Sequence, residues 1–439
     1  MIPQRPAYPF YQKANKLVAA DSLMVYRFLV GILLAFGVLR QWYYGWIEQQ
    51  YIRPDFFFFY EGFSWVKPYS QEFIYFLFAA LFLSSLGMAF GWRPKLSAAI
   101  SFFCFTYIEL IDKTNYLNHY YFISIILFGF ALMPSLPGLW GRQQLRFFWL
   151  FLFRFQVGVV YVFAGLAKLG SDWLLEAQPL SIWLKATGYV PILSQFLEMN
   201  YVPYIMSWAG AFFDLFVVFF LIYPRTRIPA YLCVILFHVV TWVLFPIGLF
   251  PWVMIAGAAL FFPPTWPRRM ILIKSKFASP KNRCIRCPQP IPYPLIALAV
   301  LYVLIQVLLP LRSLTYRGNT LWTEEGFRFS WKVMLIEKAG FARFTIHYSN
   351  GSTEVIYPSD WLTPLQVKMM STQSDMIIQF AHHLEDRFDH RSIEAIFVDS
   401  KVSFNGRRAQ TFIRPDANLL QYTSLEGAQI VETLQVGLL

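Results

Sequence analysis

The feature that most constrains this chain is a series of apolar stretches that are long enough to cross a membrane. A helix needs about 20 mainly apolar residues to span the hydrocarbon core of a bilayer. With Pro, Gly and basic clusters as boundaries, we expect spans over residues 23–44, 71–90, 96–111, 119–134, 145–168, 203–223, 228–246, 249–263 and 292–310. The expected fold is therefore a multi-pass α-helical membrane bundle of about nine spans.

The composition supports a membrane environment. Hydrophobic residues make up 57% of the chain and charged residues 14%, whereas a soluble domain has about 25% charged residues. Arg53–Phe63, "RPDFFFFYEGF", is an apolar segment between spans, and it lies either in a loop or in the membrane interface. We expect an integral membrane protein whose first span acts as the insertion signal.

Basic residues indicate the orientation, because Lys and Arg concentrate in short cytoplasmic loops. With the N-terminus in the cytoplasm, basic residues fall at every expected cytoplasmic turn, namely Arg93, Lys95, Arg142, Arg146, Arg225, Arg227 and the segment from Arg268 to Arg286. Topology and contact with anionic lipid then account for the formal net charge of +12. We expect the lipid bilayer as a partner, no nucleic-acid partner, and location in a bacterial inner membrane.

The region after Leu311 differs from the rest of the chain. An odd number of spans makes residues 1–311 the transmembrane domain and residues 312–439 an extracytoplasmic domain. Apolar residues alternate on both sides of Asn350-Gly351, a dipeptide that favours tight hairpins. "SDMIIQFAHHLEDRF" has helical periodicity, and "IEAIFVDSKVSFNGRRAQTF" alternates again around a Gly-containing turn. We expect a small, mostly-β (α+β) C-terminal domain.

Cysteine and histidine patterns give no metal site. Cys284 and Cys287 form a CxxC motif in the expected cytoplasmic loop, but no second pair completes a tetrahedral zinc site. Their role stays open. His382, His383 and His390 lie on the expected C-terminal helix, where a solvated face accounts for them. We expect no metal cofactor.

Ionisable residues at membrane depth are costly, so they indicate function or pairing. Within the expected spans we note Arg27, Arg154, Lys168, Asp214 and His238. Asp112, Lys113 and His119 lie at the mouth between two spans. Because the alternation of spans brings the 112–119 turn and Lys168 to the same outer side, we expect them to share one pocket.

The span over residues 145–168 carries one polar or small face. Arg154, Gly158, Tyr161, Gly165 and Lys168 are spaced four, three, four and three residues apart, which aligns them on a helix. Each has a structural alternative: Gly permits close helix approach, Arg154 pairs with Asp214, and Lys168 snorkels to the interface. In the same way His119 and His238 satisfy hydrogen bonds, and Asp112 caps its turn.

Several segments together resemble a known family. "DKTNYLNHYYF" (112–122), "YVFAGLAKLGSDWL" (161–174) and "LFHVVTWVLFPIGLFPWVMIAGAALFFPPTWPRR" (236–269) resemble, in this order, the vitamin K-dependent gamma-glutamyl carboxylases and their bacterial relatives, which share a transmembrane HTTM domain. "FTIHYSNGSTEVIYP" and "TFIRPDANLL" resemble parts of the domain that follows in that family. The resemblance covers the chain from the first span to about residue 422.

The resemblance implies a coupled reaction. Enzymes of this family oxygenate reduced vitamin K to its epoxide and use the strong base so formed to remove a γ-proton from a glutamate, whose carbanion adds CO2. The implied cofactors are a reduced naphthoquinone (menaquinol or phylloquinol), O2 and CO2, and the implied partner is a glutamate-containing protein or peptide. This chain is far shorter than the vertebrate enzymes, which leaves the binding of a protein substrate open.

The resemblance also assigns roles to residues. Lys168 matches the lysine regarded as the initiating base, and Asn118 with His119 matches the pair placed at the quinone and the developing carbanion. Tyr116 stands where vertebrate enzymes carry Trp. Trp331 and Met334 in "FRFSWKVML" resemble a segment that folds back against the quinone cavity. Independently of the resemblance, their positions within or beside the spans indicate supporting roles for Asp112, Arg154, Tyr161, Asp214 and His238.

Two other functions remain as alternatives. A relative that binds or epoxidises a quinone without carboxylation would form epoxide and incorporate no labelled CO2. A transporter, or a haem or di-iron protein, is disfavoured because only two histidines lie within or beside the spans, and because we find no inverted repeats with broken helices.

Overall fold

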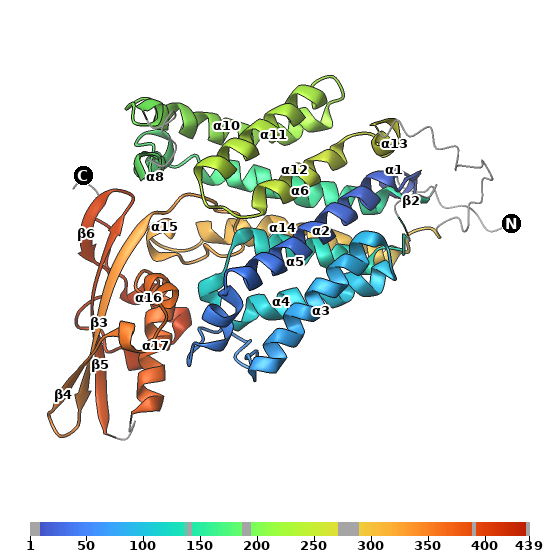
Figure 1. The fold of residues 1–439 in the computed structure, drawn as a ribbon. Helices are drawn as coiled ribbons and strands as arrows, with labels where there is room; N and C mark the ends of the chain where they lie inside the picture. Colours follow the sequence, from blue (N-terminus) through green and yellow to red (C-terminus); the bar gives the residue numbers. More distant parts are fainter. Residues whose placement is uncertain are drawn as a thin grey trace.

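The computed structural model describes residues 9–136, 138, 143–186, 195–270, 289–388 and 392–435. A bundle of long helices occupies residues up to Leu311, and the C-terminal region covers one end of it (Figure 1). We call this end the domain end. Helix α1 (Pro9–Ala14), the first helix that the structure describes, lies at the opposite end (Figure 1).

Helices form at all nine expected positions. They are α2 (Asp21–Tyr43), α3 (Gln71–Phe90), α4 (Pro94–Ile111), α5 (Asn118–Leu132), α6 (Phe147–Ala167), α10 (Val202–Ile222), α11 (Arg227–Leu244), α12 (Phe250–Ala258) and α14 (Tyr293–Leu311). In the described residues, seven of them are long and apolar enough to cross a membrane. The two others, α5 and α12, are shorter apolar helices, so the expected count of nine spans stays a prediction.

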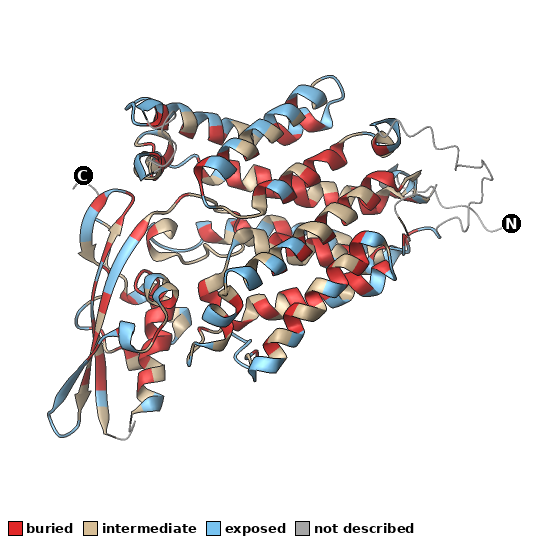
Figure 2. Cartoon of the chain, viewed as in Figure 1, coloured by how far each residue is buried: buried red, intermediate tan, exposed pale blue. Residues whose placement is uncertain are grey.

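The helices pack through small residues and expose apolar side chains outward. A Cβ atom at Gly165 of α6 would lie 2.5 Å from the backbone nitrogen of Leu215 in α10, so only Gly allows this approach. On the outside of α14, Leu298 and Leu308 are 61% and 60% exposed. Exposed surface likewise covers the outer faces of α10 and α11 (Figure 2). Such faces suit lipid, and the chain is a multi-pass membrane protein.

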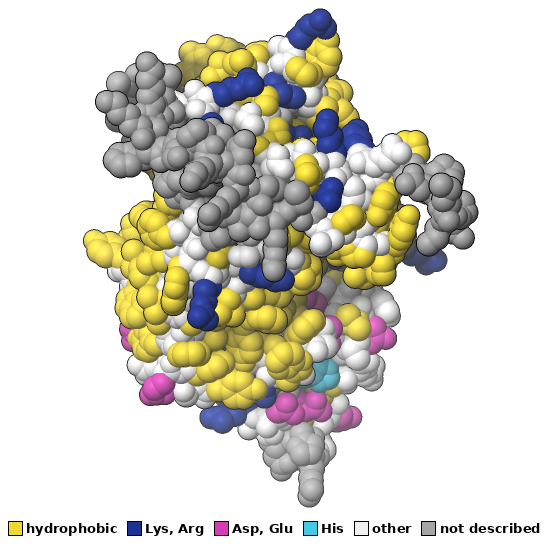
Figure 3. Space-filling view, turned by 90° about the vertical axis from the view of Figure 1, so that its right-hand side faces the viewer, with side chains coloured by type: hydrophobic (Ala, Val, Ile, Leu, Met, Phe, Trp, Pro, Cys, Tyr) yellow, Lys and Arg dark blue, Asp and Glu magenta, His cyan; other side chains and the backbone are white. Residues whose placement is uncertain are grey.

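Basic side chains gather at the end of the bundle opposite the C-terminal region (Figure 3). They include those of the α3–α4 and α10–α11 turns, as the orientation rule predicts. Arg142 and residues 271–288, which also entered that prediction, lie outside the described residues, as do Cys284 and Cys287.

The C-terminal region contains a four-stranded antiparallel sheet. Its strands, in the order β4-β3-β5-β6, are β4 (Thr353–Ile356), β3 (Lys338–Tyr348), β5 (Ile393–Phe404) and β6 (Arg407–Thr411). Gly351 and Gly406 have φ of 80° and 85° in the two hairpin turns, as the alternating patterns predicted. Helix α17 (Ser374–Arg387) packs on the sheet, with the Phe344 and Phe380 rings 5.1 Å apart.

An apolar loop of the bundle completes the core of this region. Phe58, in the segment "RPDFFFFYEGF", is fully buried among side chains of the sheet and α17. Its carbonyl accepts a hydrogen bond of 2.8 Å from the Lys113 backbone nitrogen. The segment is therefore a loop that holds the C-terminal region to the bundle.

Two ion-pair sites hold the C-terminal region in place. At the first, the Lys113 Nζ atom lies 2.7 Å, and an Arg328 nitrogen 2.8 Å, from Oδ2 of Asp375. At the second, Arg407 donates two hydrogen bonds, of 3.0 and 2.8 Å, to Asp172 in the loop after α6. The C-terminal region is thus fixed at two places, one beside α5 and one beside α6.

Candidate functional site

Two neighbouring cavities lie at the domain end of the bundle. The larger has a volume of about 390 Å³ and is lined by α2, α4, α5 and the segments around 248 and 332. The smaller, of about 80 Å³, lies between α6, α10, α11 and α12. Their walls share four residues, Ile247, Phe250, Val333 and Met334. The single expected pocket is therefore two adjoining cavities.

Lys168 lines the smaller cavity as half of a buried ion pair. It follows the last turn of α6, and its Nζ atom lies 2.7 Å from Oδ2 of Asp214 in α10. The two residues are 5% and 6% exposed. The Nζ atom also lies 5.3 Å from the centre of the Trp173 ring. Snorkelling to the interface is thus wrong for Lys168, because its charged end points into the protein.

A second polar pair lines the same cavity. The Tyr161 hydroxyl and Nε2 of His238 in α11 are 2.8 Å apart and hydrogen-bonded. The predicted alignment on α6 brings Tyr161, Gly165 and Lys168 to the side that faces α10 and α11. Lys168, Asp214, Tyr161 and His238 therefore each have a protein partner on a neighbouring helix.

The alternative pairing of Arg154 with Asp214 is wrong. Arg154 instead donates hydrogen bonds of 2.7 and 2.9 Å to the backbone carbonyls of Leu260 and Phe262. It precedes Lys168 by 14 positions, or about 20 Å along the helix axis. Since α10 runs antiparallel to α6, Asp214 lies near Lys168 and far from Arg154. Arg154 supports the end of α12 and lines neither cavity.

The turn before α5 is built by Asp112. Its carboxylate accepts hydrogen bonds of 2.9 Å from the Thr114 backbone nitrogen and 2.9 Å from the Gln366 side chain of the C-terminal region. Burial raises the pKa of Asp112 to about 6, and these hydrogen bonds oppose the rise. The predicted cap is confirmed, and Asp112 also joins the turn to the C-terminal region.

Tyr116 and Asn118 connect this turn to the chain that enters the C-terminal region. The Tyr116 hydroxyl donates to Oδ1 of Asn118 over 3.0 Å and accepts from the Phe329 backbone nitrogen over 2.6 Å. Nδ2 of Asn118 donates to the Lys332 carbonyl over 2.9 Å. Both side chains line the larger cavity, where these bonds fix their orientation.

His119 lines the larger cavity with a free ring. Its ring centre lies 4.6 Å from that of Tyr120 and 5.4 Å from that of Phe250. Within the described part of the chain, neither ring nitrogen makes a hydrogen bond. The imidazole is available to a bound molecule, unlike the hydrogen-bonded ring of His238.

The segment from Phe327 to Met334 closes both cavities. Phe329, Trp331 and Met334 have φ of 64°, 57° and 58°, a conformation that costs about 1 to 3 kcal/mol for a non-glycine residue. Met334 lies in the wall shared by the two cavities. Trp331 does not line either one. Instead it stacks on Tyr121, with ring centres 5.1 Å apart, and supports the wall from behind.

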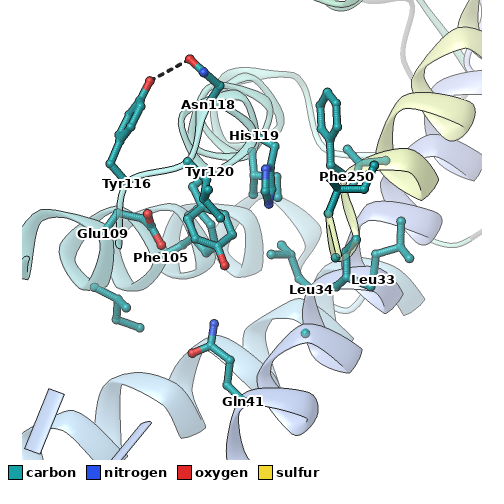
Figure 4. A pocket seen from close by; sticks show the side chains of 18 of the residues that line it. Leu33, Leu34, Gln41, Phe105, Glu109, Tyr116, Asn118, His119, Tyr120 and Phe250 are labelled. Atoms are coloured by element: carbon teal, nitrogen blue, oxygen red, sulfur yellow. Dashed lines mark hydrogen bonds between the residues drawn. The ribbon is translucent and has the colours of Figure 1, made fainter. Parts of the chain in front are cut away.

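Several polar residues of the larger cavity were absent from the sequence prediction, among them Arg40, Gln41 and Glu109. Figure 4 shows the side chains of Glu109, Tyr120 and His119 directed into the space between α4, α5 and α2, with Gln41 across from them. Arg40 and Gln41 of α2 and Glu109 of α4 all line this cavity. The sequence did contain a feature that could have identified two of them, because Arg40 and Glu109 are ionisable residues inside expected spans.

The described residues contain no group of three or more His, Cys, Asp or Glu side chains placed to hold a metal ion. His382 bonds to Glu385 and to the Tyr422 carbonyl. His390 lies outside the described part of the chain. The chemistry of the candidate site thus rests on Lys168, Asp214, His119 and the polar groups around them.

Comparison with known families agrees with this arrangement. Residues 15–266 match the model described as the HTTM domain. Residues 292–432 match the model described as the vitamin K-dependent gamma-carboxylase, lumenal domain. No solved structure matches the chain. Because the two matches cover both the bundle and the C-terminal region in the expected order, the chain belongs to the vitamin K-dependent gamma-carboxylase family.

Proposed function

We propose that this membrane protein couples oxygenation of a reduced naphthoquinone to its epoxide with carboxylation of glutamyl residues by CO2. The observation that carries the proposal is the buried Lys168–Asp214 pair, which lines a cavity adjoining a larger one with mainly apolar walls. When bound, a reduced naphthoquinone supplies the electrons for O2 chemistry and the strong base that removes a γ-proton from glutamate.

The larger cavity fits the ring of a naphthoquinone. Ligand cavities of this kind have volumes of about 300 to 1,000 Å³, apolar walls and few polar groups. This one has about 390 Å³, with Leu33, Phe105 and Phe250 among its walls and Asn118 and His119 among its polar groups. Its helices are expected to stand in lipid, which supports binding of a hydrophobic quinone.

Lys168 is the proposed base that removes the first proton. An amine accepts a proton only in its neutral form, and Lys168 is paired with a carboxylate at 2.7 Å. Transfer of the shared proton from Lys168 to Asp214 gives a neutral amine without creating net charge in the cavity. The exclusion of water from these apolar walls preserves a strong base that water would quench.

His119 is the proposed donor to anionic charge that develops on the substrate. Its ring is held between Tyr120 and Phe250 and makes no hydrogen bond in the described part of the chain. A positioned donor in a dry site stabilises developing negative charge. Tyr116 and Asn118 orient the start of α5 and therefore the histidine that follows.

The test uses full-length protein in lipid nanodiscs. It is incubated with reduced menaquinone or phylloquinone, O2, ¹⁴C-bicarbonate and a short glutamate-containing peptide. We expect quinone epoxide and peptide-bound label. Epoxide without label would favour a quinone-epoxidising protein that does not carboxylate. Absence of both products, together with absence of quinone binding, would contradict the proposal.

A second measurement separates the two half-reactions. His119→Ala should lower carboxylation more than epoxidation, because the histidine acts after oxygenation. Phe105→Leu in the same cavity serves as a control for altered shape, and it should change both rates by similar factors. Equal loss of both products in His119→Ala would assign His119 to the shape of the cavity alone.

A further inference from the structure

The arginines at membrane depth differ in how their guanidinium groups are satisfied. Arg27 donates to the backbone carbonyls of Leu136 and Gly138, and Arg154 donates to those of Leu260 and Phe262. These contacts keep the charge paired with protein oxygen atoms where water is scarce. Both arginines therefore have structural roles that need no ligand.

Arg40 has no such partner. In the described part of the chain its guanidinium makes no hydrogen bond and no ion pair. It lies over the Trp46 ring, 4.9 Å from the ring centre, and against the backbone of Gly248. Neither contact is a hydrogen bond, so the donors of the guanidinium stay available. The side chain lines the larger cavity.

Other free polar atoms lie around Arg40. Arg40, His119 and Tyr120 all line this cavity. The amide oxygen of its neighbour Gln41 is buried without a partner in the described part of the chain. Glu109, which lines the same cavity, forms no ion pair with Arg40. Arg40 and His119 can thus both donate hydrogen bonds to an anion that enters the cavity.

We infer that Arg40 binds the carboxylate of an acidic peptide side chain that enters the larger cavity. The inference rests on the proposed function, which requires a glutamyl side chain near His119. A planar guanidinium with free donors matches a carboxylate in a two-point contact. Arg40 lies in the last turn of α2, at the domain end, so a peptide reaches it from the side that carries the C-terminal region.

The experiment measures peptide binding rather than turnover. Full-length protein is placed in nanodiscs of neutral lipid, and binding of two fluorescent peptides is followed by anisotropy. The peptides are identical except that one carries glutamate and the other glutamine. For wild type we expect the glutamate peptide to bind about 10 to 100 times more tightly, the range for a hydrogen-bonded charged group.

Arg40→Gln should abolish the preference for glutamate, and Arg40→Lys should retain part of it because the charge remains. Arg53→Gln is the matched control, since Arg53 is exposed and lies outside the cavity. This control should keep the full preference. Thermal unfolding of each variant verifies that the fold is intact.

Several outcomes would overturn the inference. One is equal binding of the two peptides to wild type, and another is an undiminished preference in Arg40→Gln. A third is that Arg40→Gln alters only the effect of anionic phosphatidylglycerol in the nanodisc, which would make Arg40 a contact for lipid phosphate. Quinone binding by wild type is measured in parallel. If it persists while the peptides fail to discriminate, the inference fails and the proposed function stands.

Discussion

The two cavities differ in how their polar groups are satisfied. In the smaller cavity Lys168 pairs with Asp214, and Tyr161 with His238. In the larger one the His119 ring and the Arg40 guanidinium lack hydrogen bonds within the described residues. Buried polar groups in proteins are nearly always paired. Lys168 and Asp214 are buried and follow this rule, whereas Arg40 and His119 are only half-buried and keep donors available to a ligand.

The largest expected effect comes from removing the Lys168 amine, which lines the smaller cavity. Lys168→Arg keeps a positive charge that cannot act as a base, and Lys168→Met keeps much of the length without the amine. Both should lower quinone epoxidation by about 100- to 10,000-fold, the range for a general base. The measurement is initial epoxide formation by purified protein.

For Lys168 the control is chemical rescue. A small exogenous amine should restore part of the activity of Lys168→Ala, because that substitution leaves space for it. If Lys168→Arg keeps near wild-type epoxidation, Lys168 is not the base. The Lys168–Asp214 pair would then have only a structural role.

The second prediction concerns the stability of the pair. Asp214→Asn leaves the Lys168 charge buried without its carboxylate, so the free energy of unfolding should fall by about 3 to 5 kcal/mol. The double variant Lys168→Met/Asp214→Asn removes both charges and should be more stable than Asp214→Asn alone. Denaturant unfolding in detergent measures both. A double variant that is less stable than the single one would show that the unpaired Lys168 charge does not cause the loss.

The third prediction extends the comparison to a paired group outside the membrane. Burial by itself would raise the pKa of Asp375. The positive charges and hydrogen bonds of Arg328 and Lys113 have the larger effect and hold this pKa well below its usual value. Since the folded-state pKa is the lower one, the stabilisation is complete above the unfolded pKa of about 3.9 and declines as the pH falls further. At pH 7, Asp375→Asn should cost about 2 to 3 kcal/mol.

Hydrogen exchange in the C-terminal region reports this loss. Asp399→Asn is the control, because the Arg343–Asp399 pair is 43% and 48% exposed and should contribute less than about 1 kcal/mol. Similar effects of the two substitutions would mean that Asp375 does not hold the C-terminal region to the bundle.

The smallest expected effect on stability comes from a substitution in the larger cavity. Glu109 has no hydrogen bond or ion pair within the described residues, so Glu109→Gln breaks no contact. The free energy of unfolding should change by less than about 0.5 kcal/mol. A loss above about 2 kcal/mol would reveal a partner for Glu109 and remove the contrast between the cavities.

Local patterns in the sequence were sufficient for much of the fold. Apolar length located all nine helices, and alternation around Asn350-Gly351 located the first hairpin of the sheet. The partner of Asp214 could not be obtained in this way. Pairing across helices depends on their relative rotation and depth, which the spacing along one helix does not contain.

The same limit applied to the candidate site. Spacing correctly grouped Tyr161 and Lys168 on one face of α6. It gave no sign that Trp331 would lie behind the cavity wall, because three residues with positive φ turn that segment. Arg40 and Glu109 were recognisable as ionisable residues in spans, but only the arrangement of α2, α4 and α5 around one cavity brings them together.

The two ion-pair sites between the bundle and the C-terminal region have a consequence for evolution. Lys113 and Asp172 belong to the bundle, while their partners Asp375 and Arg407 belong to the C-terminal region. A charge change on one side leaves a partner unpaired unless the other side changes with it. Homologous chains should therefore exchange these residues in pairs, and the two regions should be inherited as one unit rather than recombined freely with other domains.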